Sequence, residues 1–117
     1  MNIEKIIKNM KEFDYSSIDT DEFFDGRDID EFDLEWGNVY AKINKNEIPD
    51  SLRKQSDDYR KEIFLTIDEI VGESELAEYI SDDIELLMFA DYLGIDTEWF
   101  SKFITKYENG ELPTGIL

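Results

Sequence analysis

The sequence predicts an all-α fold of five or six helices, with an acidic, partly irregular segment near the N-terminus. Apolar residues recur three and four positions apart along most of the chain, as on the buried face of a helix. Residue types that begin and end helices stand between these stretches. The chain has 117 residues, of which 41% are hydrophobic, so it has enough apolar material for a core. We therefore expect one compact helical domain over residues 1–117.

The first helix is expected over residues 2–12, whose apolar side chains fall at the i, i+3, i+4 and i+7 positions of one face. The next segment, residues 14–28, is acidic and rich in turn-forming residues. Within it we expect a single helical turn at 21–24, with Thr20 as its N-cap.

A second long helix is expected from Asp28 to Ile43, because six apolar residues in this stretch share one helical face. Gly37 interrupts it at a cost of about 1 kcal/mol relative to alanine. A strand over residues 39–43 is the competing interpretation. Residues 44–50 contain an asparagine and a proline and are expected to form a connecting loop.

The helix with the clearest pattern is expected to begin after Ser56, an apparent N-cap, and to end at Gly72. Two aspartates follow Ser56 and would complement the positive end of the helix dipole. A short helix is then expected from Ser74 to Ile80.

Another helix is expected to begin at Ser81 or Asp82, because Asp82 and Glu85 have the spacing of a capping box. It would end at Gly94. The last helix is expected to start at residue 96 or 97 and to end at residues 109–110, followed by an extended tail.

The charge of the chain is −18, from 30 acidic and 12 basic residues, and it is unevenly distributed. Residues 14–35 hold ten acids and a single base, Arg27, which is half of the whole excess in about a fifth of the chain. A field of this sign repels phosphate backbones and anionic lipids. We therefore expect no direct binding to nucleic acid or to a membrane, and a basic protein as the partner.

Histidine and cysteine are absent, which removes the commonest general base, the thiolate nucleophile and the usual zinc ligands. No phosphate-binding glycine loop is present. Two Asp-x-Asp pairs, at 19–21 and 28–30, begin like calcium loops but lack the acid and the glycine that should follow. We predict no catalytic residue, no metal site and no cofactor, and hence not an enzyme.

Two regions are candidates for partner contact. In the acidic segment, carboxylates alternate with aromatic residues, an arrangement typical of an interface with apolar anchors and a charged rim. The aspartates of the 81–83 tripeptide, at an apparently exposed helix start, could grip a basic side chain while they cap the helix. The predicted contact residues are Asp19, Asp21, Glu22, Phe23, Phe24, Asp25, Asp28, Asp30, Glu31, Asp33, Asp82 and Asp83.

One stretch of the chain resembles a known family. A Tyr-Arg-x-Glu-x-Phe pattern at residues 59–64 is followed by GESELAEYISDDIELL at 72–87 and by a tryptophan-containing helix that ends in Tyr-x-x-Gly-x-x-Pro at 107–113. Over residues 56–115 this resembles the small helical immunity proteins of bacterial contact-dependent inhibition and polymorphic toxin systems. The resemblance implies a cytoplasmic antidote, encoded beside its toxin, that blocks the toxin's catalytic domain, often a nuclease.

Two other functions compete with this interpretation. A nucleic-acid mimic of phage or plasmid origin would also be acidic, although its carboxylates should be spread at the spacing of phosphates rather than bunched. A hydrolase that uses carboxylates, with or without a metal ion, is the enzymatic alternative. No signal peptide is expected, because charged residues separate the first apolar ones, and the absence of cysteine suits a reducing compartment. The free protein is expected to be a monomer or a weak dimer.

Overall fold

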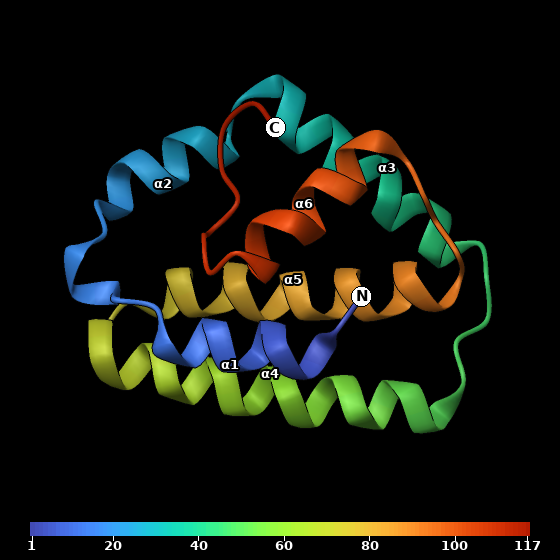
Figure 1. The fold of residues 1–117 in the computed structure, drawn as a ribbon, viewed down its shortest axis with the longest axis horizontal. Coiled ribbons are helices and arrows are strands. Elements are labelled where there is room, and N and C mark those ends of the chain that lie inside the picture. The colour runs from blue at the N-terminus through green and yellow to red at the C-terminus, as the bar shows by residue number, and fades with distance from the viewer.

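The computed structural model describes all 117 residues and contains six α-helices, one 3₁₀ helix and no strand, which confirms the predicted all-α class (Figure 1). Each helix carries an apolar stripe that it must bury against a neighbour. The elements are α1 (Ile3–Glu12), η1 (Tyr15–Ser17), α2 (Thr20–Arg27), α3 (Asp30–Asn44), α4 (Asp50–Val71), α5 (Ser74–Tyr92) and α6 (Glu98–Glu108).

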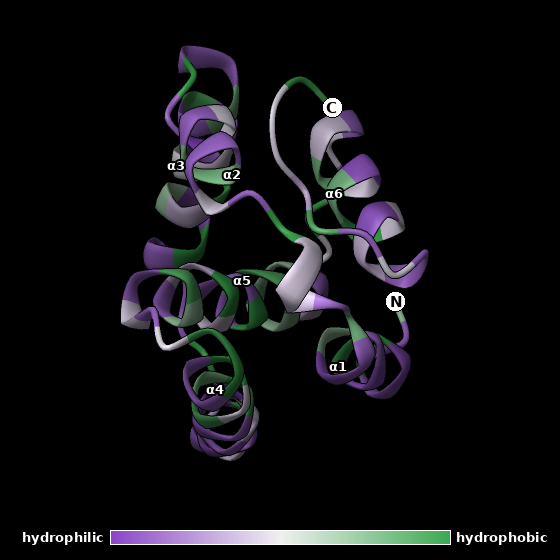
Figure 2. Ribbon diagram, turned by 90° about the vertical axis from the view of Figure 1, so that its left-hand side faces the viewer, coloured by the Kyte–Doolittle hydropathy of each residue, from purple (hydrophilic) through white to green (hydrophobic).

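Helix α5 lies at the centre of the molecule, with the other helices arranged around it (Figure 2). Eleven of its 19 residues are buried, far more than in any other helix. Helix α4 runs antiparallel to α5 along most of its length (Figure 1). The two are joined at Gly72, which has a positive φ of 71° that a residue with a side chain rarely adopts. This pair forms the base on which the rest of the chain packs.

The C-terminal tail returns across the molecule and fastens α2 in place. It passes between α2 and α6 (Figure 1). The Gly115 amide donates to the Gly26 carbonyl at 3.1 Å, and the Thr114 hydroxyl donates to the Phe23 carbonyl at 3.0 Å. A β-carbon added at Gly26 would lie 2.1 Å from Thr114 Oγ1, so only glycine allows this close approach.

Three predicted boundaries are wrong. Helix α4 begins at Asp50, after Pro49, and Ser56 is a buried residue inside it rather than an N-cap. Pro49 is the N-cap of α4 and has an extended ψ of 142°, so the helix starts only at the next residue. Helix α5 is continuous through residues 81–83, so the predicted helix start there does not exist.

The third wrong boundary concerns the acidic segment, which is more regular than expected. Instead of one turn, α2 has eight residues, and its N-cap is Asp19, whose side chain accepts from the Glu22 amide at 3.1 Å. Helix α3 continues through Gly37, so the competing strand at residues 39–43 is also wrong. Gly37 is exposed, and its cost in helix propensity is small beside the burial of the apolar face of α3.

None of the helices combines the length and the apolar character that a membrane crossing requires.

Candidate protein-binding surface

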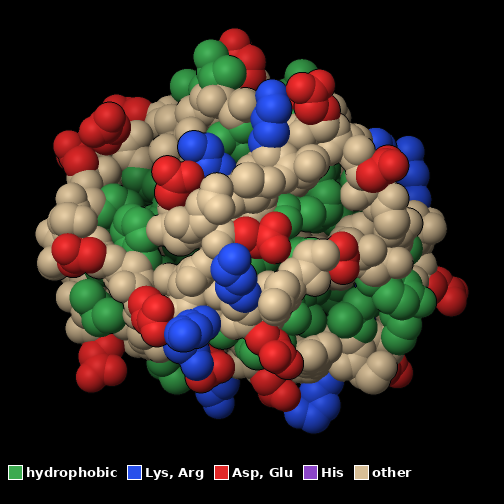
Figure 3. Space-filling view, viewed as in Figure 1, with side chains coloured by type: hydrophobic (Ala, Val, Ile, Leu, Met, Phe, Trp, Pro, Cys, Tyr) green, Lys and Arg blue, Asp and Glu red, His purple; other side chains and the backbone are tan.

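The acidic residues of positions 14–35 have no basic partner. None of these ten carboxylates lies within ion-pair distance of a lysine, an arginine or the N-terminus, whereas nine of the 20 other acidic residues do. Nine of the ten are exposed. We call these ten side chains the acidic face. They run from Asp14, the N-cap of η1, along α2 and its caps to the first turns of α3, and carboxylates are visible over α2 in the space-filling view (Figure 3).

Part of this acidity has a local role in the helices. Asp19 caps α2, and Asp21 and Glu22 lie in its first turn. Asp30, Glu31 and Asp33 occupy the first turn of α3. Carboxylates in such positions complement the helix dipole by about 0.3–1 kcal/mol each. This local gain explains why acids begin a helix, but not why so many stand together without any base beside them.

The only base of the acidic segment is turned inward. Arg27 is buried, and its guanidinium makes a two-pronged ion pair with Asp83, NH1 to Oδ1 at 3.1 Å and NH2 to Oδ2 at 2.5 Å. Its Nε donates to the Pro113 carbonyl at 2.8 Å. The guanidinium also lies over the rings of Phe23 and Phe32, 4.9 and 4.5 Å from their centroids. Arg27 therefore does not neutralise the acidic face.

Asp83 is completely buried and accepts from two further donors. Trp36 Nε1 donates to its Oδ1 at 3.0 Å, and the Tyr107 hydroxyl donates to its Oδ2. We call Arg27, Trp36, Asp83 and Tyr107 the Asp83 cluster. Burial alone would lower the pKa of Arg27, but the carboxylate of Asp83 raises it overall. Burial, and then the Asp83 charge, raises the pKa of Tyr107. The buried charge is thus paired and fully hydrogen-bonded, as a stable fold requires.

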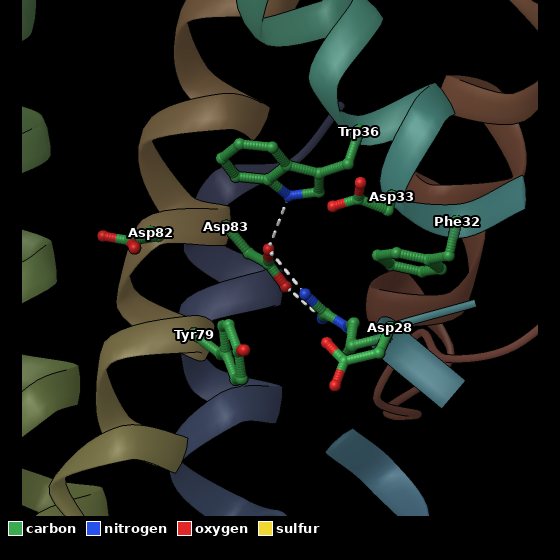
Figure 4. Close-up of a pocket in the computed structure, with 8 residues that line it drawn as sticks. Asp28, Phe32, Asp33, Trp36, Tyr79, Asp82 and Asp83 are labelled. Carbon is green, nitrogen blue, oxygen red and sulfur yellow. Dashed lines mark hydrogen bonds and ion pairs between the residues drawn. The ribbon is translucent and has the colours of Figure 1, made fainter. Parts of the chain in front are cut away.

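A pocket opens beside this cluster, between the junction of α2 with α3 and the side of α5 (Figure 4). Its volume is about 240 Å³. The buried Arg27–Asp83 pair forms its floor, Trp36 and Tyr79 stand on opposite sides, and Asp33 and Asp28 lie on the third side. The lining residues are Arg27, Asp28, Phe32, Asp33, Trp36, Tyr79, Asp82 and Asp83.

Asp82, the neighbour of Asp83, has the opposite orientation. Its side chain is about half exposed and points away from the cluster, where Arg60 NH2 lies 2.8 Å from its Oδ1 (Figure 4). Arg60 NH1 also lies 2.9 Å from Glu85 Oε2. Burial raises the pKa of Asp82 above its ordinary value, although Arg60 opposes this. A second hollow of about 250 Å³ adjoins the pocket and shares Asp82 and Trp36 with it.

The structure changes which of the predicted contact residues a partner could touch. Asp83 is 0% exposed and Phe23 is 3% exposed, so both belong to the interior. Phe24 is half-buried against Tyr79, with 5.3 Å between the ring centroids. Asp82 is held in an ion pair. The other eight predicted residues are exposed and unpaired: Asp19, Asp21, Glu22, Asp25, Asp28, Asp30, Glu31 and Asp33.

Two aromatic residues at this surface were not predicted as contacts. Trp36 and Tyr79 are both only partly buried, and both line the pocket. Their rings join the acids of α2 and α3 to the side of α5. No group of three or more acidic side chains is arranged so that it could hold a metal ion.

The fold and this surface define a small helical protein with an unpaired acidic face. The only base of the acidic segment, Arg27, is buried. Residues 2–114 match the model of the family described as Immunity protein PIM1, and the chain belongs to this family. Its function is accordingly that of an immunity protein, which agrees with the resemblance found over residues 56–115. No curated protein matches the chain.

Proposed function

We propose that this immunity protein neutralises its cognate toxin by covering a basic active-site groove of the toxin domain with the acidic face. The observation that carries this proposal is the complete lack of basic partners for the ten acids of residues 14–35. A carboxylate that the chain needed for its own stability would more often be paired or buried, as Asp83 is.

Physical reasons favour a partner of the opposite sign. Like charges gathered on one surface repel one another, and a basic partner relieves that repulsion when it binds. Complementary fields also speed association, from about 10⁵–10⁶ per molar per second for neutral surfaces to about 10⁸–10⁹ at low salt. Fast capture is an advantage for an antidote, because each free toxin molecule does damage until it is bound.

A nuclease domain is the toxin that we propose. A groove that holds nucleic acid must present basic side chains to the phosphates. The acidic face has the sign of a phosphate backbone, so it would compete for the same groove. The membership of the chain in an immunity protein family favours inhibition of one toxin over general mimicry of nucleic acid.

Co-expression with the toxin domain encoded beside this chain tests the proposal. The native chain should protect cells. A triple variant, Asp21→Asn, Asp25→Asn and Glu31→Gln, removes three exposed, unpaired acids of the acidic face and should protect poorly. A matched control, Glu47→Gln, Glu69→Gln and Asp96→Asn, removes three exposed, unpaired acids elsewhere and should protect as the native chain does.

Two results would contradict the proposal. One is that the native chain gives no protection against this toxin domain, in which case the proposed function fails. The other is equal protection by both triple variants, which would show that the acidic face has no special part in binding.

A further inference from the structure

The pocket beside the Asp83 cluster suits the end of one side chain rather than a whole small molecule. Its volume of about 240 Å³ lies below the range of about 300–1,000 Å³ that is usual for ligand and cofactor sites. It lies within the acidic face, because Asp28 and Asp33 belong to both. A partner that covered the acidic face would therefore also cover the mouth of this pocket.

The charges around the pocket favour a cation. Asp28 and Asp33 are exposed and have no basic partner. The one arginine in the pocket, Arg27, is ion-paired with Asp83. Burial is the main cause that raises the pKa of Tyr79, and the negative charges of Asp28 and Asp33 raise it further. The two carboxylates therefore act on the opposite wall of the pocket. An anion would find two unpaired carboxylates here and no free base.

The walls favour a flat cation. Trp36 and Tyr79 face each other across the pocket (Figure 4). The indole of Trp36 is fixed, because its N–H is bound to Asp83 at 3.0 Å. A guanidinium stacks on aromatic faces and forms two parallel hydrogen bonds to a carboxylate, whereas an ammonium is a compact and strongly hydrated charge. Arg27, which also lines the pocket, already shows this chemistry, because its guanidinium lies over the rings of Phe23 and Phe32.

The geometry points to a receptor site for one arginine of the toxin domain, an inference that rests on the proposed function. The guanidinium enters beside Trp36 and pairs with Asp33 and Asp28, and the Arg27–Asp83 pair beneath it keeps the walls in place. This arginine is the anchor of the interface, and the rest of the acidic face steers the toxin domain toward it.

Two aspartates of one helical turn provide the test. Asp33 lines the pocket and Asp30 does not, yet both are exposed, unpaired and in the first turn of α3. We expect Asp33→Lys to weaken binding of the purified toxin domain by about 100-fold, because a desolvated charge pair is lost and a like charge takes its place. Asp30→Lys makes the same change in net charge and should weaken binding by less than about 5-fold. Titration calorimetry measures both affinities.

Two further variants sharpen the result. Asp33→Asn keeps the shape of the side chain and should weaken binding by about 10-fold, which covers the case in which the lysine variant folds poorly. In the toxin domain, single arginines are replaced by glutamate, and one such variant should bind Asp33→Lys better than it binds the native chain. Circular dichroism checks that each variant is folded.

The possible outcomes separate the two proposals. If the substitutions at 30 and 33 weaken binding equally, the receptor site is wrong, while the proposed function stands. If the native chain binds the toxin domain and no charge change on α3 alters the affinity, the receptor site is wrong and the acidic face loses its role. If the native chain does not bind the toxin domain at all, the proposed function itself fails.

Discussion

Two groups of carboxylates in this protein are used in opposite ways. Asp83 is fully buried, paired with Arg27 and hydrogen-bonded to Trp36 and Tyr107. The carboxylates of the acidic face are almost all exposed, and none has a basic partner. The Asp83 cluster joins α2, α3, α5 and α6, and through Arg27 it also holds the C-terminal tail.

The difference teaches where each charge acts. Charges inside the protein must be satisfied within it, so their loss should appear in the free energy of unfolding. Charges on the acidic face have no partner within the protein and can interact with a binding partner. Their loss should therefore lower the affinity for that partner. The cluster lies directly under the pocket and fixes the elements that carry the face. The predictions below ask whether these two roles separate.

The largest effect is expected from Arg27→Met. It leaves the buried carboxylate of Asp83 without its countercharge and should lower the free energy of unfolding by about 3–5 kcal/mol, a large part of the total for a domain of this size. Urea denaturation measures the change. Arg53→Met is the control and should cost less than about 1 kcal/mol, because this exposed arginine forms no ion pair and contacts only the face of Phe89, 5.5 Å from the ring centroid. A similar, small cost for both substitutions would show that the cluster does not hold the fold.

A smaller effect is expected from Tyr107→Phe, which removes one hydroxyl donor from Asp83. The cost should be about 1–3 kcal/mol, because a buried acceptor loses its partner. Tyr40→Phe, at an exposed ring whose hydroxyl makes no hydrogen bond within the protein, is the control and should be nearly neutral.

The Tyr107→Phe variant also tests how the stability depends on pH. Burial raises the pKa of Tyr107 above its ordinary value of about 10 in the folded protein. The stability that depends on its protonated hydroxyl is therefore complete below pH ~10 and is lost as the pH rises through the raised pKa. Urea denaturation across this alkaline range should show less loss of stability for Tyr107→Phe than for the native chain. Equal loss in both proteins would contradict the assignment.

Gly26→Ala should cost about 1–3 kcal/mol, because its β-carbon would meet Thr114 in the tail that holds α2. Gly37→Ala is the matched control: it also lies in a helix, but a β-carbon there meets nothing within 4 Å. It should stabilise the protein by about 0.5–1 kcal/mol through helix propensity. Thermal unfolding measures both changes, and destabilisation of equal size at both positions would argue against the tail contact.

The smallest effect on stability is expected on the acidic face. Asp25→Asn or Glu31→Gln should change the free energy of unfolding by no more than about 1 kcal/mol each, since each removes an exposed, unpaired charge whose local effect is limited to the helix dipole. A loss of several kcal/mol in urea denaturation would mean that these acids serve the fold, and the comparison with Asp83 would collapse.

Much of the fold could be predicted from the sequence, because apolar residues recur at helical spacing along most of the chain. The two wrong helix starts at Ser56 and at Ser81 or Asp82 share one cause. The tripeptide Ser-Asp-Asp occurs at residues 56–58 and 81–83, and both times it was interpreted as a helix start. Both copies lie inside helices, where Ser56 and Ser81 are buried. Residues that favour caps are tolerated in the interior of a helix when burial of its apolar face outweighs their weak preference.

The candidate site was harder to predict, since the pairing of distant residues decides it. The exposure of the eight acidic contact residues could be predicted from the local excess of acidic residues alone. The burial of Asp83 had one signal that was overlooked: it stands three residues after Ile80 and four before Leu87, on an apolar stripe. Arg27, the only base among ten acids, was the natural partner. Nothing local could show that these two residues, 56 positions apart, would meet.

The most direct test of the central claim is the rate constant of association with the toxin domain, measured by stopped flow at increasing salt concentration. If the acidic face attracts a basic partner, the rate constant should fall at least about tenfold between ~0.05 M and ~0.5 M salt. The Asp21, Asp25 and Glu31 triple variant should show a clearly weaker dependence. A rate constant that responds neither to salt nor to these three substitutions would contradict the claim.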